Sequence, residues 1–209
     1  MLNEPTTDTR VRVFSSLFDL LNVKYFIVSA STKIEQPDFQ LAFENPRYHV
    51  YRNQRVLPRS FIVHDVRVIE DGDEVLRRIA APGFRPASMA IVEEKAESLA
   101  ADAKVTSPSP RLLERSLNRV LLEASLAVPG FLVLADVFYP GWKCFVDGKE
   151  TKIFRANYVM RGVFLPAGRH RVEFRFDPLS FKIGGVISVT TLLVISGWLF
   201  WSMRRKASG

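Results

Sequence analysis

The sequence has very few of the residues that build disulfides, metal centres and nucleophilic active sites. Its one cysteine, Cys144, excludes an internal disulfide and leaves the redox compartment open. Three histidines, His49, His64 and His170, lie far apart, and no cysteine or carboxylate completes a zinc-binding spacing around them. The sequence also lacks a glycine-rich phosphate loop and a Gly-x-Ser-x-Gly motif. We therefore predict no metal, no cofactor and no catalytic residue in this chain.

Nucleic-acid binding is disfavoured although the chain is basic. The 209 residues carry a net charge of +7. However, lysine and arginine are scattered through strand-like segments, and no basic run is interleaved with stacking aromatics. The expected partners are membrane lipid and, beyond it, a polyprenyl-phosphate sugar or an anionic cell-envelope glycan.

Charge is absent from one long stretch near the C-terminus. Between Lys182 and Arg204 lie 21 uncharged residues, Ile183–Met203. As a helix they span roughly 30 Å, the thickness of the hydrocarbon core of a bilayer. Trp198 and Trp201 are typical of the membrane interface. A buried helix of a soluble core is the alternative, but such helices are usually shorter, so we predict a transmembrane helix over residues 181–203.

The orientation of this helix follows from the short tail after it. Residues 204–209 contain three basic residues and no acidic one. Short basic segments stay in the cytoplasm, whereas long folded domains cross the membrane largely regardless of their charge. We therefore expect a protein of the cell membrane with a cytoplasmic tail and its main domain, residues 1 to about 180, outside the cytoplasm.

The first hundred residues mix helical and strand patterns. Apolar residues at helical spacing predict a helix over Thr6–Asn22. A second helix over Glu74–Ala81 follows the capping sequence Asp71-Gly72-Asp73. Strands are expected at Val23–Val28, Arg47–Arg52, Arg59–Val68 and Ser88–Val92. Residues 101–110, which close with Ser107-Pro108-Ser109-Pro110, are predicted to be a linker.

Strand and turn patterns dominate from Arg111 onward. Apolar and charged residues alternate through Arg169–Phe176, and Asp147-Gly148 is typical of a tight hairpin turn. Short strands at this spacing predict an antiparallel β-sandwich. The expected fold is α+β and mainly β: a mixed α/β part (1–100), a linker (101–110), a β-sandwich (111–180), a transmembrane helix (181–203) and a tail (204–209).

Polar and aromatic residues of the predicted sandwich form a candidate glycan site. Aromatic faces pack against sugar C–H groups, while carboxylates, amides and guanidinium groups bind hydroxyls. The candidates are Asp136, Tyr139, Trp142, Asp147, Asn157, Tyr158 and Arg161. The alternative is structural: Trp142 lies in the core, Tyr139-Pro140-Gly141 is only a turn, and Asp136 fixes that turn. Cys144 alternates with Trp142 and Val146, which predicts a buried, unreactive thiol.

Several motifs of this segment together resemble a known family. They are Tyr139-Pro140-Gly141-Trp142, Val146-Asp147-Gly148-Lys149, Leu165-Pro166-Ala167-Gly168-Arg169-His170 and Asp177-Pro178, with Leu57-Pro58-Arg59 earlier in the chain. In this order they resemble the C-terminal end of bacterial YfhO-like multi-spanning membrane proteins. The resemblance implies a glycosyltransferase that uses lipid-linked donors and adds sugars to wall or lipid-linked polymers outside the cytoplasm.

The resemblance also implies parts that this sequence does not contain. Such proteins carry many spans before the soluble domain, and their catalytic carboxylate lies in an early extracytoplasmic loop. We therefore expect the chain to be the accessory domain and last span of a longer protein, non-catalytic alone and partnered by an upstream membrane portion. The alternative is a free-standing, membrane-anchored glycan-binding or structural module.

Overall fold

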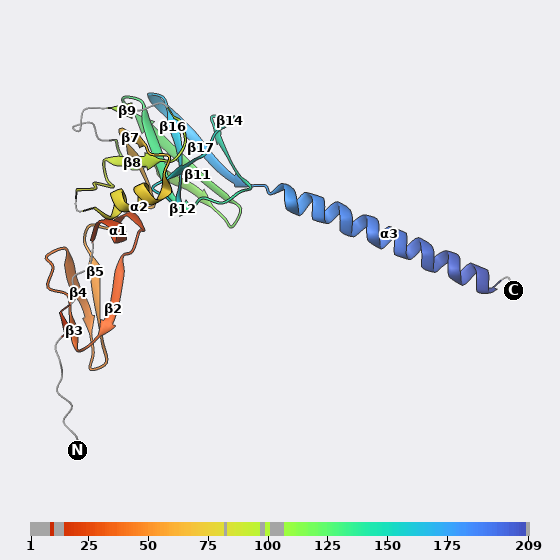
Figure 1. The fold of residues 1–209 in the computed structure, drawn as a ribbon, viewed down its shortest axis with the longest axis horizontal. Coiled ribbons are helices and arrows are strands. Elements are labelled where there is room, and N and C mark those ends of the chain that lie inside the picture. The colour runs from red at the N-terminus through yellow and green to blue at the C-terminus, as the bar shows by residue number, and fades with distance from the viewer. Residues whose placement is uncertain (1–8, 11–14, 82, 97–98, 101–106, 208–209) are drawn as a thin grey trace, which may run out of the picture.

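The computed structural model describes residues 9–10, 15–81, 83–96, 99–100 and 107–207. Most of these residues form a β-rich body, and one long helix leaves the body near the C-terminus (Figure 1). The body contains two large sheets that pack face to face and a smaller sheet at the N-terminal end. The mainly β, α+β fold expected from the sequence is therefore confirmed.

The first large sheet is antiparallel and comes almost entirely from the C-terminal half. Its strand order is β10 (Arg111–Arg115), β11 (Arg119–Leu126), β17 (Gly168–Phe176), β13 (Trp142–Val146) and β14 (Lys149–Thr151). In the central strand β17, Val172 and Phe174 are buried while Arg171 and Arg175 are exposed. This alternation is the one that the sequence predicts for a strand with one face on a core.

The second large sheet combines strands from both halves of the chain. Its order is β6 (Ser60–Val63), β12 (Gly130–Val137), β16 (Met160–Leu165), β15 (Phe154–Ala156), β8 (Met89–Val92), β7 (Asp65–Val68) and β9 (Leu99–Ala100). Strands β7 and β8 are parallel and are connected through helix α2 (Gly72–Ala80). The single strand predicted over Arg59–Val68 is wrong, because the chain turns at His64 and its two parts pair with different neighbours.

The core lies on both faces of the second sheet. Leu132 and Leu134 of β12 pack in the cluster between the two sheets, whereas Phe131 and Val133 pack in the cluster that contains α2. Each fully buried side chain of this size stabilises the fold by about 1.5–3 kcal/mol relative to an exposed one. Because β12 is buried on both faces, its sequence is a continuous apolar run without alternation.

The sandwich joins segments from both sides of the predicted linker. Strand β6 pairs with β12, and Ala156 of β15 pairs with Val92 of β8. Residues 101–106 of the predicted linker lie outside the described residues. The predicted division of the chain into two domains at residues 101–110 stays a prediction. Strands from before and after these residues are hydrogen bonded in one sheet.

A small antiparallel sheet forms the N-terminal end of the body. It consists of β2 (Tyr25–Ser29), β5 (Tyr48–Asn53) and β4 (Phe39–Glu44), and helix α1 (Ser15–Leu20) precedes it. The helix predicted over Thr6–Asn22 is too long, since β1 (Thr9–Arg10) pairs in parallel with β3 (Thr32–Lys33). Residues 6–8 and 11–14 of that prediction lie outside the described residues.

Two local predictions about turns and caps are confirmed. The Asp147-Gly148 turn joins β13 to β14, with φ angles of 52° and 84° that a tight hairpin turn requires. Asp71 caps α2, and its side chain accepts hydrogen bonds from the backbone N–H groups of Asp73 and Glu74. The caps and turns therefore follow the local residue chemistry.

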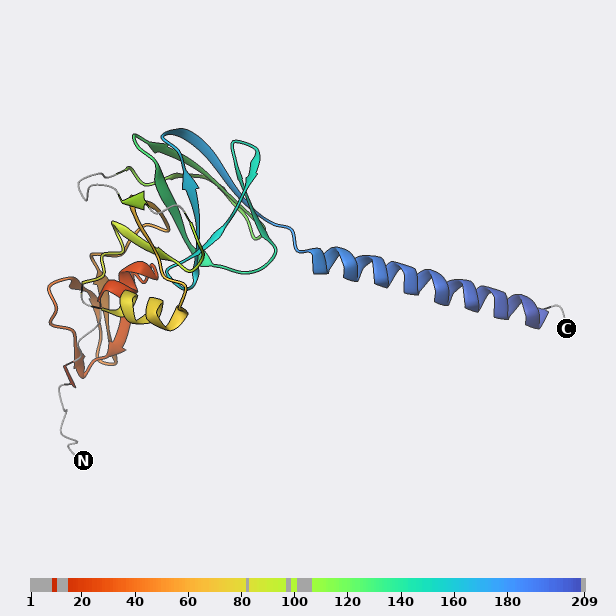
Figure 2. The same cartoon turned by 45° about the horizontal axis from the view of Figure 1, so that its top comes forward.

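Only two residues, Asp177 and Pro178, separate the apolar helix α3 (Leu179–Ala207) from the end of β17. Its segment Leu179–Trp198 has a mean hydropathy of 1.8 and is long enough to cross a membrane. None of that segment is buried against the rest of the protein. Figures 1 and 2 show the helix clear of the β body in both views. The predicted C-terminal apolar helix is therefore confirmed.

Candidate functional site

The site is built around Asp136, near the end of β12, which binds two arginines from different strands. Arg59, just before β6, donates from Nε to Asp136 Oδ1 at 2.9 Å and also contacts it through Nη2. Arg161 of β16 donates from Nη2 to Asp136 Oδ2 at 3.0 Å. Both carboxylate oxygens are thus engaged, and the carboxylate connects three neighbouring strands of one sheet.

Arg161 is a buried cation held between this carboxylate and an aromatic ring. Its residue is 2% exposed, and its guanidinium lies 3.8 Å from the ring centroid of Trp142 and 5.5 Å from that of Phe174. Burial lowers the pKa of Arg161 to about 10, and the charge of Asp136 opposes this shift. The group therefore stays protonated at neutral pH, with Asp136 as its counter-ion.

An open groove borders this cluster. One pocket of about 470 Å³ and a second of about 180 Å³ share Arg115, Val120 and Asp136. A third pocket, of about 210 Å³, shares Trp142 with the first and contains Tyr139. We call these three adjoining pockets the Asp136 groove.

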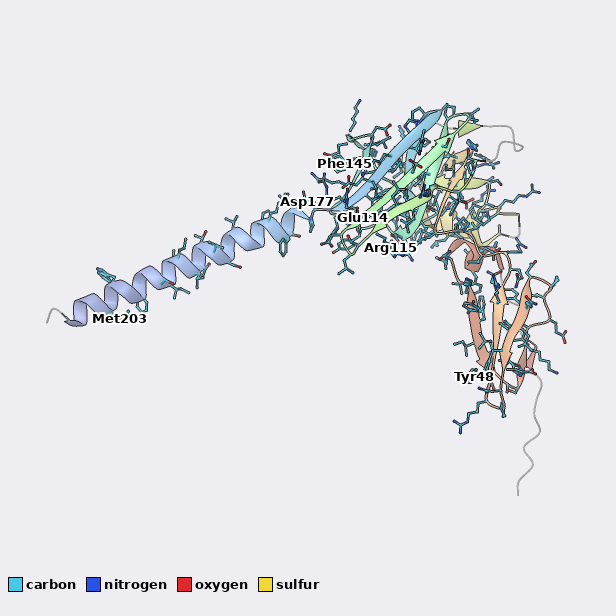
Figure 3. The ribbon with its side chains drawn as sticks, turned by 180° about the vertical axis from the view of Figure 1, so that it is seen from behind. Tyr48, Glu114, Arg115, Phe145, Asp177 and Met203 are labelled. Carbon is cyan, nitrogen blue, oxygen red and sulfur yellow. The ribbon has the colours of Figure 1, made fainter. Side chains whose placement is uncertain are left out.

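The Asp136 groove lies at the end of the sandwich from which α3 leaves. The backbone N–H of Phe176 donates to the carbonyl of Asn118 in the β10–β11 turn, at 2.8 Å. The N–H of Asp177 donates to the carbonyl of Gly141 before β13, at 2.7 Å. Figure 3 shows Glu114, Arg115 and Asp177 at this junction. We call it the anchor-proximal end.

The two aromatic candidates of the groove differ in what they offer a ligand. The Trp142 ring packs against the Arg161 guanidinium and lies 5.3 Å from the Phe176 ring centroid. Most of its contacts are therefore made within the protein. Tyr139 is 62% exposed and lies 6.4 Å from the Phe176 ring. Of the two rings, that of Tyr139 is therefore the more accessible from solvent.

Asp147 lies away from the groove, in the hairpin turn at the other end of β13. It accepts hydrogen bonds from the backbone N–H of Arg171 at 2.8 Å and from His170 Nδ1 at 2.7 Å. These contacts, the backbone one first, lower the pKa of Asp147. Its contacts in the structure are those of a turn residue.

Asn157 and Tyr158 form the turn between β15 and β16, and Asn157 bonds to the neighbouring strand β8 of the same sheet. The Asn157 side chain accepts a hydrogen bond from the backbone N–H of Ile91 at 2.9 Å, and the backbone N–H of Asn157 donates to the Ile91 carbonyl at 2.8 Å. The Tyr158 ring lies 4.6 Å from the Arg155 guanidinium. The structure thus brings Asp136, Tyr139, Trp142 and Arg161 together and places Asp147, Asn157 and Tyr158 elsewhere.

Arg59 and Arg115 belong to the groove but are absent from the predicted set. Arg59 precedes a strand and lies 77 residues from Asp136 in the sequence, so only the pairing of β6 with β12 joins them. Arg115 ends β10, a strand not expected from the sequence. The only sequence signal at Arg59 is its place in the motif Leu57-Pro58-Arg59, and this motif does not reveal that Asp136 is its partner.

The groove contains no paired nucleophile and base among the described residues. Cys144 is fully buried, as predicted, and burial raises the pKa of its thiol to about 12. The described residues also contain no group of three histidine, cysteine, aspartate or glutamate side chains that could hold a metal ion. The side chains that line the groove include Arg59, Arg115 and Asp136, which can form ionic and hydrogen-bonding contacts.

The β body, its groove and the apolar helix define the class of protein: a β-sandwich that carries a candidate membrane anchor. Residues 135–188 match the family described as "Bacterial membrane protein YfhO". The uncharacterized protein YfhO of Bacillus subtilis strain 168 is 29% identical over 89 residues. No solved structure matches the chain. The predicted resemblance to YfhO-like bacterial membrane proteins is confirmed.

The matched region is a small part of the relative. It covers 43% of this chain and 10% of the Bacillus protein. What the rest of that protein contributes is outside this sequence.

Proposed function

We propose that this chain is the extracytoplasmic accessory domain and membrane anchor of a YfhO-like protein, and that it holds a glycan during glycosylation of cell-wall or lipid-linked polymers. The observation that carries the proposal is the Asp136 groove, which lies next to the start of α3. A ligand in this groove would stay close to the bilayer, where lipid-linked sugars are available.

The lining of the groove suits a sugar with charged or hydroxyl substituents. Arg115 and Ser116 supply hydrogen-bond donors, Leu117 supplies apolar surface, and Asp136 is an acceptor. Tyr139 adds an exposed aromatic ring at the other side of Trp142. This mixture of a few polar groups with aromatic and apolar surface is typical of small-molecule sites.

The proposal assigns holding and not bond transfer to this chain. Activation of an acceptor hydroxyl needs a base within hydrogen-bond reach of its proton. Asp136, the carboxylate of the groove, already serves as the counter-ion of Arg59 and Arg161. Chemistry would then belong to the membrane portion of a longer protein, with this domain positioning the acceptor or donor.

Glycan binding by the full chain in detergent micelles tests the proposal. The probes are a polyprenyl-phosphate sugar and soluble fragments of cell-wall polymer, followed by saturation-transfer NMR and calorimetry. We expect Tyr139→Ala and Arg115→Ala each to weaken binding about tenfold, equivalent to about 1.4 kcal/mol. Tyr25→Ala, which removes a tyrosine that is 51% exposed on β2, should leave binding unchanged.

Trp142→Ala is a poorer test because it removes the ring that covers the buried Arg161. Loss of binding in that variant would not separate a ligand contact from a folding defect. Absence of binding by the unaltered chain, or equal losses in Tyr25→Ala and Tyr139→Ala, would contradict the proposed role of the groove.

A further inference from the structure

An unusual row of like charges crosses three neighbouring strands at the anchor-proximal end. Arg119 of β11 lies opposite Arg175 of β17, and Arg175 lies opposite Lys143 of β13. Directly opposed like charges destabilise a sheet. We call these three residues the basic row.

The acidic residues nearby neutralise only one end of the basic row. Arg119 forms ion pairs with Glu173 at 2.9 Å and Glu114 at 2.8 Å. Lys143 reaches Glu150 at 3.9 Å, and both of these side chains are largely exposed. Arg175 lies over the Phe145 ring at 4.5 Å, and the charge of Asp177, which pairs with Lys182, also acts on Arg175 and Lys143. Arg175 and Lys143 are therefore less closely paired with acidic residues than Arg119 is.

Exposed apolar side chains surround the same end. Leu117, at the tip of the β10–β11 hairpin, is 95% exposed, and Tyr139 is 62% exposed. Phe181, on the first turn of α3, is 80% exposed. These three side chains lie near one another. Asn118, next to Leu117, and Gly141, near Tyr139, both accept hydrogen bonds from the segment Phe176–Asp177 that precedes the helix.

The distance to the membrane is short. The last residue of β17 is Phe176 and the first of α3 is Leu179. Three extended residues reach at most about 10 Å. The head-group layer on each side of the hydrocarbon core is about 5–8 Å thick. If α3 crosses the bilayer, the anchor-proximal end therefore lies in or directly above the head groups.

We infer that the anchor-proximal end is a docking surface for anionic phospholipid head groups, with Leu117 and Tyr139 inserted into the interface and Arg175 and Lys143 binding the phosphates. Continuity with α3 and the charge of the basic row select lipid as the occupant. Arginine and lysine next to an apolar, aromatic rim match the arrangement of interfacial membrane-binding surfaces. The inference rests on the anchor, and it shares Leu117 and Tyr139 with the lining of the Asp136 groove.

The test uses the full chain reconstituted into phosphatidylcholine vesicles with and without phosphatidylglycerol. An environment-sensitive fluorophore is attached through Leu117→Cys, and a nitroxide on the lipid near the head group serves as quencher. Leu41→Cys, on β4 of the distant small sheet and 43% exposed, is the matched control. Cys144 is fully buried, so the unaltered chain serves as the labelling blank.

We expect a blue shift and quenching at position 117, both stronger with phosphatidylglycerol, and neither at position 41. The double variant Lys143→Glu with Arg175→Glu should lose most of the quenching. Arg169→Glu with Arg171→Glu, near the opposite end of β17, should retain it. These variants change exposed residues and leave the core of the sandwich intact.

Three results would overturn the inference. Position 117 could behave like position 41, which would mean that the hairpin tip stays in water. Quenching could be independent of lipid charge and of the double variant, which would remove the head-group phosphates as partners. Label-to-label quenching that grows with the protein-to-lipid ratio, without quenching by lipid nitroxide, would assign the surface to a second copy of the chain.

Discussion

At the scale of single residues, the Asp136–Arg161 pair is the interaction on which the groove depends. Asp136 has 12% of its side chain exposed and Arg161 only 3%. Breaking a buried ion pair by removing one partner typically costs about 3–5 kcal/mol, because the remaining charge is left without compensation. The pair therefore contributes both to the shape of the site and to the stability of the fold.

We expect Asp136→Asn to lower the free energy of unfolding by about 3 kcal/mol. Arg59 loses the same partner, but its side chain is 45% exposed, so water can solvate its charge. The double variant Asp136→Asn with Arg161→Met should be more stable than Asp136→Asn alone, because it leaves no unpaired buried cation. Urea unfolding of the full chain in detergent, followed by tryptophan fluorescence, measures these differences.

Asp147→Asn is the matched control for this series. Asp147 pairs with His170, but its side chain is 52% exposed, and exposed pairs contribute about 0–1 kcal/mol. Equal effects of Asp136→Asn and Asp147→Asn would show that the Asp136 pair is not effectively buried.

The Cys144 thiol gives a prediction about pH. Burial raises its pKa from 9.0 to about 12 in the folded chain. The unfolded chain releases this proton from about pH 9 upward while the folded chain keeps it, so this contribution to stability is complete below about pH 9 and is lost above it. The urea midpoint of Cys144→Ala should therefore fall less steeply with rising alkaline pH than that of the unaltered chain.

The burial of Cys144 also predicts its reactivity. Alkylation of this thiol by iodoacetamide should require unfolding, and rapid modification of the native chain would contradict the burial of the thiol.

At the scale of secondary-structure elements, the β13–β14 hairpin depends on its turn. Gly148 has φ of +84°, and a Cβ added there would meet nothing within 4 Å. The cost of a side chain at this position is thus backbone strain without a steric clash. A β-branched residue in the left-handed region is a strong outlier.

Gly148→Val should destabilise the sandwich by about 1–3 kcal/mol. Lys149→Val, one residue further on in β14, is the control and should change stability by less than about 0.5 kcal/mol. Thermal unfolding followed by circular dichroism distinguishes the two. A melting temperature of Gly148→Val equal to that of the unaltered chain would mean that the turn adopts another type in solution.

The elements that the sequence predicts are those whose pattern is local. Val172 and Phe174 alternate with charged residues, and Asp147-Gly148 carries its turn type in its own chemistry. Strand β10 could not be recognised in this way, because all five of its residues are exposed and its pairing with β11 contains a register irregularity. The helix predicted over Thr6–Asn22 is too long because Thr9–Arg10 pairs as a strand with β3, which is more than 20 residues away in the sequence.

The site could be predicted only in part for the same reason. Asp136, Trp142 and Arg161 lie in one segment of the chain, and adjacent strands bring them together. Asn157 and Tyr158 carry the polar and aromatic chemistry of a binding site, yet positive φ angles of 47° and 72° and the contacts with Ile91 and Arg155 explain them as turn residues. Residue type alone does not separate these two uses.

At the scale of the whole molecule, the β body and α3 are suited to different environments, the body to water and α3 to lipid. The body has its own core, whereas the side chains of Val189, Leu193 and Val194 in α3 are 59–68% exposed in the absence of lipid. A bilayer is the environment that covers such a surface. Membrane association is supported by this helix and by the match of residues 135–188 to the YfhO family.

Val194→Arg should weaken membrane retention, because an arginine near the centre of a spanning helix costs about 2.5–3.5 kcal/mol of insertion free energy. Val194→Leu should have no effect. Retention after alkaline extraction of membranes from expressing cells measures this difference. Unchanged retention of Val194→Arg would mean that α3 does not cross the hydrocarbon core.

Protease added outside intact cells tests the expected orientation of the whole chain. Cleavage within the β body, with an epitope on the short tail protected, is the result expected for an extracytoplasmic domain. Protection of the body with exposure of the tail would reverse the orientation and place the Asp136 groove on the cytoplasmic side.

The junction between β17 and α3 is short, and its backbone is conformationally restricted. Asp177 is fixed by its hydrogen bond to Gly141 and by an ion pair with Lys182 at 2.7 Å, and Pro178 has a restricted φ. Transmembrane helices tilt when their apolar length differs from the local thickness of the bilayer. If α3 crosses the bilayer, a change in its tilt would therefore rotate the β body, with a small movement at Asp177 and a larger one at the distant sheet of β2, β4 and β5. Bilayer thickness would then determine the height above the lipid and the angle at which the groove is presented.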